Sequence, residues 1–333
     1  TSHLVMACGI DARHAMGSLP GATFITPSME GNLAMRFEAA AAMLLESLQT
    51  LSKQTGTHRV QVVVPSQGQD CAMAGLLGML RTARLENPRL MGQLIALEPG
   101  QDVAQAVLDN RSDDAPHVRY VGGERQVQAW AERQMPMAAC PWKDHGVYLI
   151  TGGAGGLGSI FAEAIAREVR NPVLVLTGRS SPDERIHATI RALETLGAVV
   201  RYHAVDVADA TALTALVREI PEAFESLDGV VHAAGVLRDS YLAGKTRQQL
   251  RDVFAAKVAG TVNLDEATGD MPLDCFVCFS SIAGAVGNVG QADYAAANAF
   301  MDAFAHERAA RVARGERQGR TLSVNWPLWE EGG

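Results

Sequence analysis

Three side chains in the second half of the sequence are spaced so that they could act together in proton transfer. Tyr294 and Asn298 are four residues apart in a segment with a helical pattern, which places both on one face of a helix. Ser281 ends an apolar run that we predict to be a strand, 13 residues before Tyr294. The intervening residues leave room for a loop that brings the serine hydroxyl beside the phenol. We therefore expect Ser281, Tyr294 and Asn298 to share one site.

The phenol of Tyr294 needs a charged neighbour if it is to exchange protons readily. A tyrosine has an unperturbed pKa of about 10, and a nearby cation lowers that pKa and favours acid–base chemistry. Lys257, on the predicted helix before the strand that ends at Ser281, is the candidate cation. Each residue alone has an ordinary explanation in packing or solvation. The prediction depends on their joint occurrence in a nucleotide-binding fold.

A glycine-rich stretch identifies that fold. The apolar run 147–150 leads into Thr-Gly-Gly-Ala-Gly-Gly-Leu-Gly at 151–158, and apolar residues at helical spacing follow. The glycines match both G-x-G-x-x-G and a shifted G-x-x-x-G-x-G. Such glycines allow positive φ and a close approach to a pyrophosphate, which the N-terminus of the next helix also attracts. The predicted cofactor contacts here are Thr151, Gly152, Gly153, Gly155, Gly156, Leu157 and Gly158.

Further cofactor contacts are predicted where the following strands end. Arg179 lies 21 residues after Gly158, where an acidic residue would favour NAD and an arginine suits the extra phosphate of NADP. We therefore predict NADPH. Asp206 could accept a hydrogen bond from the adenine amino group or cap the next helix, and both alternatives stay open. The predicted contacts at these turns are Arg179, Ser180, Asp206, Val207, Ala233, Ala234 and Gly235, together with Lys257 and Tyr294.

Three other residues with reactive side chains are better explained by structural roles. His232 could exchange protons, but at a strand end without a visible partner it favours a structural role. Cys275 and Cys278 lie three residues apart in a predicted buried strand, so their sulfurs point to opposite faces and cannot share a metal or pair. We predict core cysteines and no metal site.

The order of predicted elements indicates an α/β fold with two Rossmann-like subdomains. In the first half, strands are predicted at 22–25, 59–64, 93–97 and 118–121, and helices at 33–51, 72–85 and 124–134. No strand there leads into a comparable glycine cluster. The second half alternates six strands with crossover helices, which predicts a doubly wound sheet with its ligand at the strands' carboxyl ends. We predict a truncated structural subdomain without cofactor at 1–145 and a complete catalytic, NADPH-binding subdomain at 146–333.

Composition excludes several function classes. The chain has 333 residues and a net charge of −8, without a long basic run, which argues against nucleic-acid binding. It has no uncharged apolar stretch of about 20 residues and no signal-peptide pattern, so we expect a cytoplasmic protein that does not span a membrane. Five scattered cysteines do not form a disulfide framework. The sequence lacks an initial methionine and ends in Glu-Glu-Gly-Gly, so we expect it to be excised from a longer chain.

The second half resembles the short-chain dehydrogenase/reductase superfamily, and more closely the ketoreductase domains of modular polyketide synthases. The resemblance lies in the segments 151–158, 232–239, 257–261, 279–281, 290–298 and 323–329. Ordinary superfamily members carry Tyr-x-x-x-Lys. This chain has Tyr294-x-x-x-Asn298 with Lys257 upstream, the exchange typical of polyketide and fatty-acid synthase ketoreductases. Residues 74–88 resemble the family's N-terminal structural subdomain, which binds no cofactor.

The resemblance implies NADPH-dependent reduction of a β-ketoacyl chain on the phosphopantetheine arm of an acyl carrier protein, beside the other domains of a synthase. It implies that Tyr294 donates a proton to the forming alkoxide while Ser281 holds the same oxygen. Lys257 is expected to lower the pKa of Tyr294 and to organise the ribose or a proton relay, and Asn298 to orient that network. A reductase of free small-molecule ketones and a non-catalytic structural domain of a synthase are the alternatives.

The resemblance also implies a stereochemical outcome. Family members that make the D-alcohol carry a Leu-Asp-Asp motif, and this chain has Leu237-Arg238-Asp239, which keeps the final aspartate. Val286 stands eight residues before Tyr294, where the opposite class carries tryptophan. We therefore predict the D-hydroxyl, or B-type, product. The predicted substrate and stereocontrol residues are Asp239, Leu237, Val286, Gln291, Trp326 and Pro327.

Overall fold

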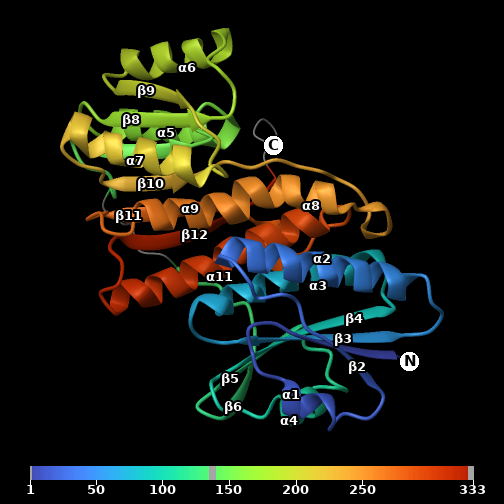
Figure 1. Ribbon diagram of the computed structural model, residues 1–333. Coiled ribbons are helices and arrows are strands. Elements are labelled where there is room, and N and C mark those ends of the chain that lie inside the picture. Colours follow the sequence, from blue (N-terminus) through green and yellow to red (C-terminus); the bar gives the residue numbers. More distant parts are fainter. Residues whose placement is uncertain (1, 135–139, 329–333) are drawn as a thin grey trace. The chain divides into compact units, whose positions relative to one another are not determined.

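The computed structural model describes residues 2–134 and 140–328 and contains two six-stranded sheets (Figure 1). The strand order is β2-β1-β3-β4-β5-β6 in the first sheet and β12-β11-β10-β7-β8-β9 in the second. The predicted α/β class with two Rossmann-like parts is confirmed. Within the described residues, no helix has the length and apolar character that crossing a membrane requires.

The first sheet is parallel except at one edge. It contains β1 (Ser2–Ala7), β2 (Ala22–Ile25), β3 (His58–Pro65), β4 (Leu90–Leu97), β5 (His117–Val121) and β6 (Glu124–Val127). Only β6 pairs antiparallel with its neighbour. Helices α2 (Leu33–Ser52) and α3 (Leu76–Glu86) lie on one face, with α1 (Arg13–Met16) and α4 (Val103–Asp109) on the other (Figure 1). Covered on both faces, β3 and β4 are buried along most of their length.

The predicted helix at 124–134 is wrong, because this segment begins with strand β6. Val121 pairs with Glu124 across a two-residue turn of Gly122 and Gly123, whose φ values are 58° and 82°. Such hairpin turns need positive φ at both central positions, which glycine adopts readily. Residues 128–134 have no regular secondary structure.

The second sheet confirms the doubly wound arrangement. Its strands are β7 (Val147–Thr151), β8 (Val173–Gly178), β9 (Val199–Ala204), β10 (Gly229–His232), β11 (Cys275–Ser281) and β12 (Arg320–Trp326). The chain starts in the middle at β7, runs outward to β9, and returns to β10 on the other side of β7. Such a reversal between neighbouring parallel strands marks the ligand crevice at their carboxyl ends. Both β7 and β10 end there, at Thr151 and His232.

The helices of the second sheet follow the same reversal. Helices α5 (Gly156–Glu168) and α6 (Glu184–Thr195) connect the outward strands, and α7 (Ala210–Phe224) and α9 (Gly260–Ala267) precede the returning ones. Because parallel crossovers are right-handed, the two pairs cover opposite faces of the sheet. Figure 1 shows α7 and α9 along one face.

The described fold forms two compact units. Unit 1 consists of Thr1–Trp130, Leu237–Phe254 and Ser280–Glu307, and unit 2 of Ala131–Val236, Ala255–Phe279 and Arg308–Gly333. Unit 1 therefore combines the first sheet with α8 (Arg247–Phe254), α10 (Ile282–Val286) and most of α11 (Ala292–Ala313). The predicted boundary at 145/146 separates the two sheets but not the two units. The assignment of a structural and a catalytic subdomain stays a prediction.

Candidate functional site

The glycine-rich turn of unit 2 has the shape of a phosphate cradle. It connects β7 to α5, and no side chain caps that helix at its N-cap residue, Gly155. Gly152 has a φ of 67°, and a Cβ on Gly158 would overlap the carbonyl oxygen of Gly152. The turn therefore folds tightly and leaves the first amide groups of α5 open to an anion. These features fit the pyrophosphate of a dinucleotide.

The end of β10 lies directly beside this turn. A Cβ on Gly152 would lie 3.0 Å from the Cα of Ala234, and Ala233 N donates to Thr151 O over 3.0 Å. The predicted contacts Ala233 and Ala234 are therefore brought to the glycine turn. Small residues suit this place because larger side chains would fill the space above the backbone.

Thr151 and His232 form a buried pair beneath the turn. Thr151 Oγ1 lies 2.7 Å from His232 Nδ1, and both residues are fully buried. Burial lowers the pKa of His232 to about 3, and the positive charge of Lys257 acts in the same direction. The imidazole is therefore neutral at ordinary pH, which favours the structural interpretation of His232. The hydroxyl of Thr151 is engaged with this histidine, and its predicted cofactor contact stays a prediction.

The turn after β8 presents the predicted phosphate-binding arginine. Arg179 and Ser180 are exposed, and Arg179 has no hydrogen-bond or ion-pair partner within 2–134 and 140–328. Tyr202 of β9 donates from its hydroxyl to Ser180 O over 2.8 Å and so holds the turn. Asp183 caps α6 by accepting from Ile186 N over 2.9 Å. The Arg179 guanidinium is thus available to an anion.

Asp206 does not cap the following helix, so one of its two alternatives is removed. Asp209 caps α7, and Asp206 Oδ1 accepts from Ala208 N over 2.9 Å within the turn after β9. Asn263 of α9, which sequence analysis missed, donates from Nδ2 to Val207 O over 2.9 Å. Asn263 belongs to no motif in the sequence, and its role appears only when α9 is placed beside this turn. The adenine contact of Asp206 stays a prediction.

Lys257 lies in a π-helical turn, Ala255–Ala259, between α8 and α9. Such turns are rare and occur frequently at functional sites. The side chain is buried and donates from Nζ to Phe279 O over 2.9 Å. Its Cε lies 3.0 Å from the position of a Cβ on Gly235, so it extends along the backbone after β10. The predicted cofactor residues Lys257 and Gly235 are therefore adjacent.

Unit 1 brings together the other predicted catalytic residues. The Ser281 hydroxyl is hydrogen-bonded to the Tyr294 phenol. Asn298 donates from Nδ2 to Tyr294 O over 2.7 Å, one turn later in α11. Burial raises the pKa of Tyr294, and the negative charge of Asp239 acts in the same direction, while hydrogen bonds from Ser281 and Asn298 oppose them. The net direction keeps the phenol protonated; the expected lowering by Lys257 stays a prediction.

Helix α11 is held closely by the helices of the first sheet within unit 1. A Cβ on Gly78 of α3 would overlap the carbonyl oxygen of Ala295, the residue after Tyr294. Phe37 of α2 packs against Phe300 with ring centroids 4.7 Å apart. Glycine and alanine at the crossing thus allow close backbone contact, and aromatic rings fill the space farther along. The first half of the chain therefore helps to position Tyr294.

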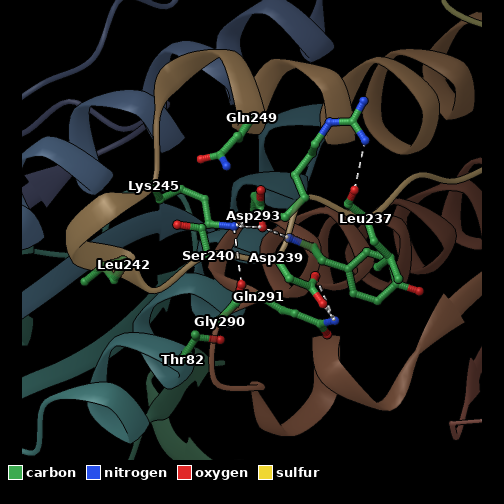
Figure 2. A network of polar contacts seen from close by, with 12 residues as sticks. Thr82, Leu237, Asp239, Ser240, Leu242, Lys245, Gln249, Gly290, Gln291 and Asp293 are labelled. Atoms are coloured by element: carbon green, nitrogen blue, oxygen red, sulfur yellow. Dashed lines mark hydrogen bonds and ion pairs between the residues drawn. The ribbon is translucent and has the colours of Figure 1, made fainter.

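Two of the predicted substrate residues of unit 1, Asp239 and Gln291, contact each other. Gln291 donates from Nε2 to both oxygens of Asp239, over 3.1 and 3.2 Å (Figure 2). The side chains of Leu237 and Val286 are exposed. This arrangement places a carboxylate and an amide close to the start of α11.

Trp326 and Pro327 have different environments in unit 2. The Trp326 ring packs against Phe161 and Phe279 with centroids 5.4 and 5.6 Å apart, in the aromatic part of the core. Pro327 is exposed. Their predicted substrate contacts stay predictions, and the indole has a clear packing role.

The cysteines show no special chemistry. No disulfide occurs within the described residues, and no group of histidine, cysteine and acidic side chains there could hold a metal ion. Burial raises the pKa of the Cys275 thiol to about 11. Cys275 is partly buried and Cys278 fully buried, as expected of two residues on opposite faces of one strand.

Known proteins of one kind resemble this chain. Residues 146–331 match the family model described as KR domain. Polyketide synthase PksL of Bacillus subtilis (strain 168) is 46% identical over 306 residues, which are 90% of this chain and 7% of the synthase. Polyketide synthase PksN of the same organism is 42% identical over 343 residues, 99% of this chain and 6% of that synthase. The chain therefore spans a small part of both synthases.

A solved structure agrees over the whole fold. The crystal structure of a ketoreductase domain from the bacillaene assembly line has a TM-score of 0.95 and 38% sequence identity. The match covers 100% of this chain and 82% of that one.

Proposed function

Because the chain belongs to the KR domain family, the ketoreductase domains of polyketide synthases, we propose that it reduces a β-ketoacyl thioester on an acyl carrier protein to the β-hydroxyacyl thioester. Family membership makes it an oxidoreductase of the short-chain dehydrogenase/reductase type that uses a nicotinamide cofactor. The observation that carries the proposal is the hydrogen-bonded pair of Ser281 and the protonated phenol of Tyr294. Two hydroxyl donors side by side are suited to an oxygen that gains negative charge.

We propose NADPH as the cofactor, and when bound it supplies the hydride. The glycine turn and the open first turn of α5 are suited to the pyrophosphate. The exposed guanidinium of Arg179 supports NADPH over NADH, because an arginine after the second strand suits a 2′-phosphate. Lys257, adjacent to Gly235, is the residue that we assign to the ribose.

Side chains of the protein then bind and protonate the substrate oxygen. Tyr294 donates its proton to that oxygen, and Ser281 donates a hydrogen bond to it. The raised pKa of Tyr294 keeps the proton on the phenol until the oxygen becomes basic enough to take it. Asn298 holds the Tyr294 carbonyl and so fixes the first turn of α11. A part for Lys257 in a proton relay is the alternative role that the resemblance implies.

We further propose the D-configured product. Asp239, fixed by Gln291, supports this assignment because it keeps the acidic end of the Leu-Arg-Asp segment near Tyr294. Exposed Leu237 and Val286 are the apolar residues that we assign to the acyl chain. We propose a phosphopantetheinyl carrier protein and neighbouring synthase domains as the partners, and the match to a small part of two long polyketide synthases supports the neighbouring domains.

The test is NADPH oxidation with a β-ketoacyl thioester, either free or on a carrier protein, for the wild type and for Tyr294→Phe. Removal of a positioned general acid costs about 10² to 10⁴ in rate. Tyr120→Phe, in the first sheet, is the matched control and is expected to keep wild-type rates. Equal rates in the wild type and Tyr294→Phe would contradict the proton donor. A wild type inactive on thioesters would instead support a structural domain, and preference for free ketones a small-molecule reductase.

A further inference from the structure

A lysine that sequence analysis missed is buried in unit 1 beside the start of α11, the helix that carries Tyr294. The side chain of Lys245 is 0% exposed, and its Nζ donates to Asp293 Oδ1 over 2.8 Å, to Arg238 O over 2.6 Å and to Gly290 O over 3.3 Å. An ammonium group has three donors, and these contacts use all of them. Figure 2 shows Lys245 at the centre of this network. Lys245 therefore joins the segment after β10 to the beginning of α11.

Its partner Asp293 immediately precedes Tyr294. The Asp293 side chain is 1% exposed, and its Oδ1 also accepts from Tyr294 N over 2.8 Å. Its second oxygen, Oδ2, has no hydrogen-bond partner in the described part of the chain. The carboxylate therefore contacts both Lys245 and the backbone of the proposed proton donor.

Stability alone does not explain this pair. Moving two charges out of water costs several kcal/mol of free energy per ion. The attraction between them offsets that cost only when their remaining lone pairs accept hydrogen bonds. Here one carboxylate oxygen is not satisfied. The contacts that the pair makes with the backbone are specific, because they fix Arg238 O, Gly290 O and Tyr294 N at once.

Other contacts keep the same segments together when the pair is absent. Glu86 of α3 accepts from Leu242 N over 2.6 Å and from Gly290 N over 2.8 Å. Gln49 of α2 donates to Leu242 O and Lys245 O, over 2.8 Å each. Ser240 N also donates to Gly290 O over 2.9 Å. Loss of the Lys245 ammonium should therefore disturb the position of residues 238 and 239 rather than release the segment.

We propose that Lys245 and Asp293 are positioning residues that fix Asp239 relative to Tyr294 and thereby select the configuration of the hydroxyl product. Asp239 follows Arg238, whose carbonyl Lys245 holds, and Gln291 precedes Asp293 by two residues. Both residues of the Asp239–Gln291 contact are thus tied to the same ammonium–carboxylate pair. This proposal rests on the proposed ketoreductase activity.

The test compares Lys245→Met with the double variant Lys245→Met/Asp293→Asn. We expect Lys245→Met to lower the ratio of the major to the minor alcohol about tenfold, which corresponds to about 1.4 kcal/mol between the two transition states. KM should rise more than kcat falls, because Tyr294 and Ser281 remain. The double variant removes the unpaired buried carboxylate and should recover thermal stability. Its product ratio should stay altered, since Arg238 O still lacks its lysine donor, while Gly290 O keeps only its bond from Ser240 N.

Arg251→Met is the matched control. It removes an ion pair to Glu38 in the same unit, at a place where the two side chains are 56% and 36% exposed, and should keep the wild-type ratio. A folded Lys245→Met with an unchanged ratio and KM would overturn the proposal. So would a double variant that recovers both stability and ratio, because the pair would then only balance charge. If Lys245→Met does not fold, Asp293→Asn alone must still change the ratio. A wild type without β-hydroxyacyl product would refute the activity itself.

Discussion

Burial raises the pKa of the Tyr294 phenol, and the carboxylate of Asp239 acts in the same direction, so two residues from separate segments of unit 1 are electrostatically coupled. A negative charge nearby disfavours the phenolate. Asp239 therefore helps burial to keep the proposed proton donor protonated.

Neutralising Asp239 should lower the pH at which activity is lost on the alkaline side, which we call the alkaline limit of the reaction. A proton donor works in its protonated form, so activity is present below the pKa of Tyr294 and is lost as pH rises through it. In Asp239→Asn that pKa is lower, and the alkaline fall in kcat/KM should occur at lower pH than in the wild type. Asp270→Asn, an exposed change in unit 2, is the control. A limit that stays in place or moves upward would contradict the coupling.

The local pattern of apolar and turn residues in the sequence predicted the second half of the fold well. The glycine turn, the six strands of the second sheet and the helix that carries Tyr294 and Asn298 were all predicted, because apolar periodicity and turn residues act over short distances. The first sheet differs from its prediction at β1, which was not predicted, and at β6, where a helix was predicted. Strand β1 is a buried apolar run at the chain's start, and the Gly122–Gly123 dipeptide indicates a hairpin rather than a helix.

The polar network around Tyr294 could not be predicted in the same way. Lys245 and Asp293 are 48 residues apart, and a lysine or an aspartate in a sequence is by default a solvated surface residue. Glu86 comes from the other half of the chain, more than 150 residues from its partner Leu242. These charges meet where α2, α3 and α11 contact the segment that carries Lys245 in unit 1, and those contacts are long-range.

Replacing Arg179 should weaken NADPH binding selectively. A hydrogen bond to a charged group contributes about 1.5 to 3 kcal/mol, so Arg179→Ala should raise the KM for NADPH by about ten- to a hundredfold. The KM for NADH should change little, because that cofactor lacks the 2′-phosphate. Arg191→Ala, which breaks an exposed ion pair to Glu184, is the control. Steady-state kinetics with both cofactors will show whether the effect is selective, and an equal loss for both would remove Arg179 from the phosphate site.

Adding a methyl group at Gly78 should destabilise unit 1. In the interior of a helix, alanine is more favourable than glycine by about 1 kcal/mol of folding free energy. Here, however, its Cβ would overlap the backbone carbonyl of Ala295, and overpacking costs about 1 to 3 kcal/mol, towards the upper end when backbone must move. We expect Gly78→Ala to lose about 1 to 2 kcal/mol in urea unfolding and to lose activity, since α11 shifts with Tyr294. Gly17→Ala, with open space around its Cβ, should change stability by less than about 0.5 kcal/mol. Equal stability of the two variants would contradict the close helix crossing.

The buried imidazole of His232 should make the protein less stable in acid. Its folded pKa is about 3 and its ordinary value is 6.5, so the unfolded chain takes up a proton that the folded protein refuses. The stability contributed by the neutral ring is complete above about pH 6.5 and is lost at about 1.4 kcal/mol per pH unit as pH falls towards the folded pKa. From pH 7.5 to pH 5 this amounts to about 2 kcal/mol.

His232→Gln keeps a polar side chain that can contact Thr151 but removes the titration. We therefore expect the variant to be less stable than the wild type at pH 7.5, because a less well fitting side chain replaces the ring. Its further loss of stability between pH 7.5 and pH 5 should be about 2 kcal/mol smaller than that of the wild type, in urea titrations at each pH. Other titrating groups contribute equally to both proteins and cancel in this difference. Parallel pH dependence of the two proteins would mean that His232 accepts a proton in the folded state, and an acid–base role for it would then have to be considered again.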